Sequence, residues 1–190
     1  MADNLWLIRH GETAWTISGA HTGSTDLALT EQGRQRAMSV GSALAGKKFS
    51  LVLSSPLIRA LDTCRLAGLG DAVQIEPRMR EWNYGDYEGK STHDIRETRP
   101  GWYLWRDGVP DGETAEQVGV RADAVIERAM SAQGDVALFS HGHFLRILGA
   151  RWLGLDATGG RLLALDTASI SVLGFERDVC VIKRWNSPSS

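Results

Sequence analysis

The feature of the sequence that most restricts the fold is the apolar run of residues 5–8 (LWLI), which is followed directly by Arg9, His10 and Gly11. Such a run is typical of a strand buried on both faces of a sheet. Alternation along a continuing strand would place Arg9 and His10 on opposite faces, so they can share a pocket only if the strand ends here. Gly11 permits that turn. The stretch therefore predicts a strand end that delivers a permanent cation and an imidazole, groups suited to bind and attack a phosphate.

Length, charge and cysteine content restrict the class of protein. The chain has 190 residues, which suits one domain with one core, and we treat residues 1–190 as a single domain. A net charge of −2 gives no basic surface for nucleic acid or an anionic membrane. Cys64 and Cys180 are too few for a disulfide framework and lack zinc-site spacing. We see no signal-peptide pattern and no apolar run of membrane-spanning length, so we expect a cytoplasmic protein.

Strand-like and helix-like segments alternate along the chain. Further strands are predicted over residues 51–53, 73–75 and 135–140, and a hairpin over 169–175 and 179–185. Helices are predicted from a Thr30 N-cap to Gly46, from a Ser55 N-cap with Pro56 at its first position, and over 113–132 and 142–153. The order predicts an α/β fold, a three-layer sandwich in which helices flank a mainly parallel central sheet.

Two stretches depart from this alternation. Residues 11–29 are rich in Gly, Ser and Thr, and we interpret them as a long loop that returns over the first strand end. Residues 77–112 contain all three tyrosines and three tryptophans (Trp82, Trp102 and Trp105), interleaved with charges and glycines. We interpret them as a lid-like insertion that covers a site.

Three strand ends carry groups that can surround an anion. The first ends in Arg9 and His10, the last parallel strand ends before His141, and Arg59 lies in the first turn of a helix that follows another strand. Ligands of parallel sheets bind beyond the carboxyl ends of the strands, and helix N-termini hold anions. The His141-x-His143 pair could instead ligate a metal, but no nearby carboxylate completes a ligand shell, so we predict no metal.

Four blocks of sequence together resemble the signature of the histidine phosphatase superfamily, which includes the cofactor-dependent phosphoglycerate mutases. In chain order they are residues 7–13, 22–33, 54–60 and 140–142. The resemblance implies a phosphoglycerate mutase-like α/β sandwich and a phosphohistidine intermediate. By matched position, His10 is the nucleophile, Arg9, Arg59 and His141 form the phosphate pocket, and Glu81 falls where the family keeps its proton donor.

The chemistry of phosphoryl transfer supports these roles. Charge spreads over the equatorial oxygens of the transferred group, so positioned cations provide most of the stabilisation. Arg9, Arg59 and a protonated His141 could provide it without a metal or cofactor. His10 must be neutral at its attacking nitrogen, and we expect a backbone carbonyl to hold the other nitrogen. Glu81 would protonate the leaving alkoxide and then take a proton from the attacking water.

Residues 77–112 contain the features that favour a phosphatase over a mutase. Where the mutases carry an arginine pair after the lid tryptophan, this chain has Arg106 followed by Asp107, which argues against tight carboxylate binding. Residues 80–89, 105–108, 112–114 and 140–146 resemble the branch that contains sedoheptulose-1,7-bisphosphatases and related bacterial acid phosphatases. By position in this family, the substrate-binding candidates are Thr16, His21, Thr22, Gly23, Tyr84, Arg106, Gly142 and Arg146. Thr16 stands where many members carry Asn.

We therefore predict a phosphomonoesterase that acts on small sugar phosphates or bisphosphates, with a small phosphorylated metabolite as its partner and no cofactor. One alternative is a phosphoglycerate mutase primed by 2,3-bisphosphoglycerate. Another is a catalytically silent domain that binds phosphorylated ligands. The aromatic segment could also support a homodimer.

Overall fold

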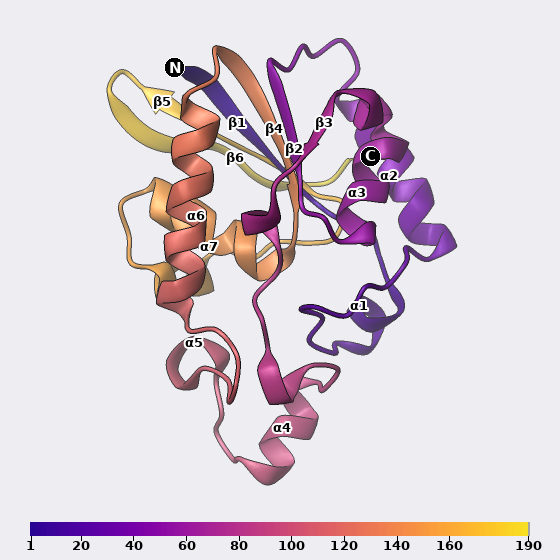
Figure 1. Ribbon diagram of the computed structural model, residues 1–190, viewed down its shortest axis with the longest axis vertical. Helices are drawn as coiled ribbons and strands as arrows, with labels where there is room; N and C mark the ends of the chain where they lie inside the picture. The colour runs from indigo at the N-terminus through magenta and orange to yellow at the C-terminus, as the bar shows by residue number, and fades with distance from the viewer. Residues whose placement is uncertain (190) are drawn as a thin grey trace.

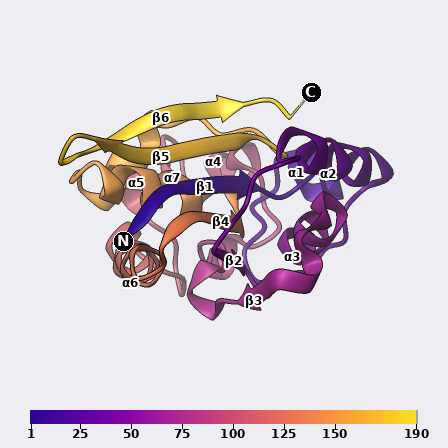
Figure 2. The same ribbon diagram turned by 90° about the horizontal axis from the view of Figure 1, so that it is seen from above.

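The computed structural model describes residues 1–189 and is built on a six-stranded sheet with helices on both faces (Figures 1 and 2). The strands are β1 (Ala2–Arg9), β2 (Leu51–Ser54), β3 (Val73–Ile75), β4 (Gly134–Ser140), β5 (Ile170–Glu176) and β6 (Val179–Ser187). Their order is β3-β2-β4-β1-β5-β6. The first four run parallel, β5 pairs antiparallel with β1, and β6 pairs antiparallel with β5. The predicted α/β fold with a mainly parallel central sheet is confirmed.

Helices cover the sheet in two layers. On one side lie α2 (Glu31–Ala43) and α3 (Ile58–Cys64), and on the other lie α6 (Ala115–Met130) and α7 (Gly142–Trp152) (Figure 2). Successive side chains of a strand point to opposite faces, which divides the core in two. Towards α6 and α7 it contains Leu5, Leu7, Leu138, Val125 and Phe144. Towards α2 and α3 it contains Trp6, Ile8, Phe139, Val40 and Cys64.

The two irregular stretches lie together beyond one end of the sheet. The stretch 11–29 contains a short helix, α1 (Ala14–Ser18), within the predicted loop. Residues 77–112 contain α4 (Thr92–Thr98) and α5 (Leu104–Asp107), which Figure 1 shows below the sheet. Trp82 and Trp102 from this stretch are buried and join the core beneath α6 and α7. The remaining short elements are a π-helix (Arg65–Leu69) and 3₁₀ turns over Gly70–Ala72, Pro77–Met79, Gly85–Tyr87 and Ala157–Leu162.

The predicted helix starts are correct for α2 and wrong for α3. Thr30 caps α2 by accepting from the Gly33 N–H. Helix α3 begins at Ile58, not at Pro56, and its N-cap, Leu57, offers no side-chain acceptor. The Ile58 N–H is instead satisfied by the carboxylate of Asp26, at 2.7 Å, from the distant stretch 11–29. Among residues 1–189, no helix is both long and apolar enough to cross a lipid bilayer.

Candidate active site

The pairing of the strands brings the predicted chemical groups to one edge of the sheet. Arg9 pairs with Ser140 at the ends of β1 and β4, and Ser54 at the end of β2 lies opposite Phe139. A cavity of about 220 Å³ opens beyond these ends. Its walls include nine of the residues predicted from sequence: Arg9, His10, Thr16, His21, Thr22, Glu81, Tyr84, Gly142 and Arg146.

His10 lies just beyond β1, where its N–H donates to the Ser140 carbonyl at 2.9 Å. Its Nδ1 lies 2.7 Å from the Gly11 carbonyl oxygen, as expected from the sequence. Because a carbonyl can only accept, Nδ1 carries the proton and the lone pair is on Nε2. Burial, followed by the charges of Arg59 and Arg9, lowers the pKa of His10 well below 6.5. The imidazole is therefore neutral at pH 7, with its nucleophilic nitrogen free.

Arg9 presents an unsatisfied donor at the same place. Its Nη1 donates to the Leu165 carbonyl, while its Nε is buried without a hydrogen-bond partner in residues 1–189. Gly142 permits this position, because a Cβ there would lie 3.2 Å from the Arg9 Cζ. Buried polar groups are normally hydrogen-bonded, so a free buried N–H of a guanidinium points to an anionic ligand.

Arg59 is fully buried and is not among the residues that line the cavity. Its Nη1 donates to the Thr25 carbonyl (2.9 Å), and its Nη2 donates to the Thr22 (3.0 Å) and Gly23 (2.9 Å) carbonyls. Its Nε lies 3.2 Å from His141 Nδ1. A guanidinium has five N–H donors, so one remains on Nη1. Arg59 thus holds the loop that contains Thr22 and Gly23, and it also orients His141.

The hydrogen bonds and the burial of His141 favour a neutral imidazole. It accepts from Arg59 at Nδ1, and its Nε2 lies 2.8 Å from the Ser55 hydroxyl, so the proton is on Nε2. Burial and the nearby Arg59 lower the pKa of His141 well below 6.5. These contacts therefore favour a neutral His141 and not the protonated form expected from the sequence. The His10 and His141 ring centroids are 5.2 Å apart.

Glu81 lies under the first turn of α7, 8% exposed. Its Oε1 accepts from the N–H groups of Trp82 and Phe144, both at 2.9 Å. Its Oε2 accepts from the His143 N–H at 3.0 Å. A carboxylate oxygen has two lone pairs, so Oε1 is fully occupied and Oε2 retains one. The carboxylate is fixed in place, and Oε2 is the atom that can exchange a proton.

Aromatic and basic groups form the wall of the cavity that faces residues 77–112. Tyr84 Oη lies 2.6 Å from His143 Nδ1, and the rings of His21 and Tyr84 are 4.8 Å apart. The Arg146 guanidinium lies 4.8 Å from the Trp105 ring centre. Its Nε donates to the Gly160 carbonyl at 3.1 Å.

Thr16, on α1, completes its own capping box: its hydroxyl accepts from the Thr13 N–H, and its N–H donates to the Thr13 hydroxyl. It lines the cavity with this hydroxyl already engaged.

Two predicted substrate-binding residues do not reach the cavity. The Gly23 N–H donates to the carboxylate of Glu88, at 2.9 Å and 3.0 Å to its two oxygens, and Gly23 lines a different hollow. Arg106 has a side chain 67% exposed and forms an ion pair with Asp107 at 2.8 Å. In both cases the N–H group that the family position would offer to a substrate is already hydrogen-bonded to a carboxylate of this chain.

His143 also lines the cavity, although it was not among the residues predicted from the sequence. The motif at 140–143 drew attention to it, but only as a partner of His141 for a metal. The structure separates the two side chains: His143 bonds to Tyr84, and His141 bonds to Ser55 and Arg59. Among residues 1–189, the group of three side chains spaced to hold a metal ion is exposed on α4: His93, Asp94 and Glu97.

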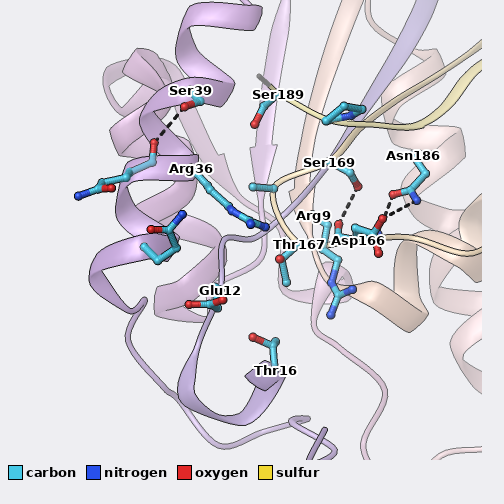
Figure 3. Close-up of a pocket in the computed structure, with 14 residues that line it drawn as sticks. Arg9, Glu12, Thr16, Arg36, Ser39, Asp166, Thr167, Ser169, Asn186 and Ser189 are labelled. Atoms are coloured by element: carbon cyan, nitrogen blue, oxygen red, sulfur yellow. Dashed lines mark hydrogen bonds between the residues drawn. The ribbon is translucent and has the colours of Figure 1, made fainter. Parts of the chain in front are cut away.

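A wider cleft of about 780 Å³ lies beside the cavity, between α2 and the segment 166–169 (Figure 3). Arg9 and Thr16 line both hollows. Figure 3 shows Arg36 extending from α2 into the cleft. The cleft contains neither His10 nor Glu81, so the groups suited to catalysis belong to the smaller cavity.

Comparison with known proteins agrees with this geometry. Residues 5–188 match the histidine phosphatase superfamily (branch 1). The chain belongs to this family. An acid phosphatase of Mycobacterium tuberculosis is 43% identical over 179 residues, which cover 92% of this chain and 88% of that protein. Sedoheptulose 1,7-bisphosphatase of Saccharomyces cerevisiae is 35% identical over 181 residues, which cover 78% and 67%.

The fold comparison gives the same result. The solved structure of an open reading frame product of Mycobacterium tuberculosis has a TM-score of 0.93 and 40% identity, and the alignment covers 99% of both chains. The family and these relatives identify the chain as a histidine phosphatase, a phosphoric monoester hydrolase, and favour the phosphatase over the mutase.

Proposed function

We propose that this histidine phosphatase is a metal-independent phosphomonoesterase that acts on small sugar phosphates or bisphosphates through a phosphohistidine at His10. Two groups beside each other in the sequence carry the proposal: a neutral His10 with its lone pair on Nε2, and the buried Nε–H of Arg9, which has no hydrogen-bond partner in residues 1–189. One supplies the nucleophile and the other an N–H for a phosphate oxygen.

In the first step, His10 Nε2 attacks phosphorus and the bond from phosphorus to the ester oxygen breaks. Arg9 and the remaining N–H of Arg59 donate to the phosphoryl oxygens, where charge develops. The leaving oxygen takes a proton from Glu81, which must enter this step protonated on Oε2. The alcohol departs, and the phosphoryl group remains on His10.

In the second step, a water molecule attacks the phosphohistidine. Glu81, now a carboxylate, accepts a proton from the water on Oε2, while the bond from phosphorus to Nε2 breaks. Inorganic phosphate leaves, and His10 recovers its lone pair. Glu81 is thereby returned to its protonated form, so atoms and protons balance over the cycle.

The sugar preference rests on the other wall of the cavity. His21, Tyr84 and Arg146 supply hydrogen-bonding groups there, and Arg146 Nη1 has no partner in the part of the chain that the structure describes. A second phosphate on the substrate would fit that free donor. The named activity of the yeast relative, on a sugar bisphosphate, supports this preference.

The test is phosphate release from a panel of sugar monophosphates, sugar bisphosphates and 3-phosphoglycerate, with a chelator present and His10→Ala as the blank. We expect release that the chelator does not reduce and that His10→Ala abolishes. Acid-labile phosphate trapped during turnover should map to His10. Mapping to His141, or formation of 2-phosphoglycerate stimulated by 2,3-bisphosphoglycerate with little release, would overturn the proposal.

We further infer that the enzyme acts on soluble metabolites in the cytoplasm, in keeping with its net charge of −2. Cell fractionation tests the location. The homodimer stays a prediction that sedimentation of the purified chain can decide.

A further inference from the structure

His143 is a cavity residue with an imidazole side chain that the reaction described above leaves unused. It is the second residue of α7, and its ring lines the cavity. Its backbone N–H donates to Glu81 Oε2 at 3.0 Å, so the residue lies next to the proposed acid. Its Nδ1 lies 2.6 Å from Tyr84 Oη.

The hydrogen bond to Tyr84 fixes where the His143 proton lies. The Tyr84 residue is 2% exposed, and its hydroxyl has no other hydrogen-bond partner in residues 1–189. If His143 donated to this oxygen, the phenol proton would be buried with no acceptor, which costs free energy. Tyr84 therefore donates and Nδ1 accepts. A neutral imidazole that accepts at Nδ1 carries its proton on Nε2.

The protonation states of the two groups agree with this assignment. Burial raises the pKa of the Tyr84 phenol well above 10, so it keeps its proton. Burial and the charge of Arg146 lower the pKa of His143 well below 6.5, so the ring stays neutral. The result is one fixed N–H donor rather than a titrating group.

The Nε2–H of His143 is open to the cavity. It makes no hydrogen bond within residues 1–189, and it is absent from the buried polar atoms that lack a partner. It is therefore accessible from the cavity that the residue lines. A fixed neutral donor in this position pairs with an uncharged oxygen of a substrate.

Resting on the proposed function, we propose that His143 is a specificity-determining residue: its Nε2–H donates to a hydroxyl or carbonyl oxygen of the alcohol part of the substrate. Tyr84 is the positioning residue that fixes this tautomer. The pair would favour phosphate esters of polyols and sugars over esters that lack such an oxygen.

The test compares two substrates: the sugar phosphate released fastest in the panel above, and phenyl phosphate, which has no oxygen outside its phosphate. The measured quantity is the ratio of kcat/KM for the sugar phosphate to kcat/KM for phenyl phosphate. A neutral hydrogen bond corresponds to a change of about tenfold, so His143→Ala should lower the ratio by about tenfold. His143→Gln, which keeps an amide N–H near the Nε2 position, should restore most of it. Tyr84→Phe should lower it several-fold.

A second readout does not depend on turnover. In a ¹⁵N–¹H spectrum of histidine-labelled protein, the resonances that disappear in His143→Ala should show the Nε2-protonated pattern. In Tyr84→Phe they should shift towards a mixture of tautomers. A substrate ratio unchanged in His143→Ala, or a His143 protonated on Nδ1, would overturn the inference. Failure of this inference can be told apart from failure of the proposed function. If the proposed function were wrong, the wild-type enzyme would release no phosphate from either ester.

Discussion

The loop that carries Glu81 is held by Arg121 of α6, and this contact gives the sharpest test of how the acid is positioned. Arg121 Nη1 donates to the Arg78 and Arg80 carbonyls, at 2.5 Å and 3.0 Å, and Nη2 lies 3.4 Å from the Glu81 carbonyl. Its Nε pairs with Glu113 Oε1 at 2.7 Å. The loop residues on the N-terminal side of Glu81 are thus bound directly to α6.

We predict that Arg121→Gln impairs both stability and turnover. The side chains of Arg121 and Glu113 are 21% and 22% exposed, so their ion pair is partly buried. We expect a loss of about 2 kcal/mol in the free energy of unfolding. A displacement of about 1 Å in a catalytic group can cost about 10² in rate. Three backbone N–H groups still hold the Glu81 carboxylate, so we expect kcat to fall by about tenfold.

The matched control is Arg128→Gln. Arg128 lies on the same helix and pairs with Glu76, which is 2% exposed, but it makes no hydrogen bond to residues 78–83. Chemical denaturation should show a similar loss of stability in both variants. Steady-state kinetics on a sugar phosphate should show a fall in kcat only in Arg121→Gln. The fall should shrink on p-nitrophenyl phosphate, because its leaving group needs little help from an acid.

Two results would refute this reasoning. If Arg121→Gln lost stability but kept its kcat, the contacts of Arg121 would support the fold without positioning Glu81. If both variants lost kcat equally, the effect would follow from general destabilisation.

Three further predictions concern residues outside the cavity. Arg106→Ala should change kcat/KM by less than about twofold, because this arginine is bound by Asp107 and exposed; a larger loss in steady-state kinetics would return it to the site. Burial raises the pKa of the Cys64 thiol to about 12, so a thiol reagent at pH 8 should modify it only after unfolding, as peptide mapping would show. Hydrogen bonds from Arg78 and Arg128 hold the pKa of Glu76 at about 2, below its usual 4.5. The stability it contributes is present above pH 4.5 and is lost as pH falls from about 4.5 to about 2, so Glu76→Gln should flatten the acid limb of a stability profile.

Local sequence signals predicted the elements that position the site. The apolar run of β1, its end before His10, and the helix that begins after His141 each depend on residues adjacent in the chain. The carboxyl ends of parallel strands meet at one edge, so the convergence of Arg9 and His10 with His141 followed from the order of the elements.

Three of the differences share a physical cause: a hydrogen bond is formed with a partner that lies far away in the sequence. Asp26 satisfies the first N–H of α3 from 32 residues away. The Ser55 hydroxyl accepts from the Leu57 N–H before the helix begins and also bonds with His141. Glu88 takes the Gly23 N–H from 65 residues away. The hydrogen bond that defines His143 comes from Tyr84, 59 residues earlier. A single sequence shows which donors exist but not which acceptors reach them.

The protonation states of the buried groups explain how the site can accept a dianion. Burial costs free energy for every charged group, and the imidazoles of His10 and His141 respond by remaining neutral. Guanidinium groups cannot respond in this way, so Arg9 and Arg59 keep their charge in a buried position.

A bound phosphate would add negative charge beside both imidazoles and raise their pKa values. For His141 that change favours the protonated form expected from the sequence, a form that belongs to the complex. For His10 the bond from Nδ1 to the Gly11 carbonyl fixes the proton of the neutral ring on Nδ1, so Nε2 is the attacking atom. Burial and the charges of Arg59 and Arg9, which lower the pKa of His10, oppose the protonation of Nε2 that a bound phosphate would favour.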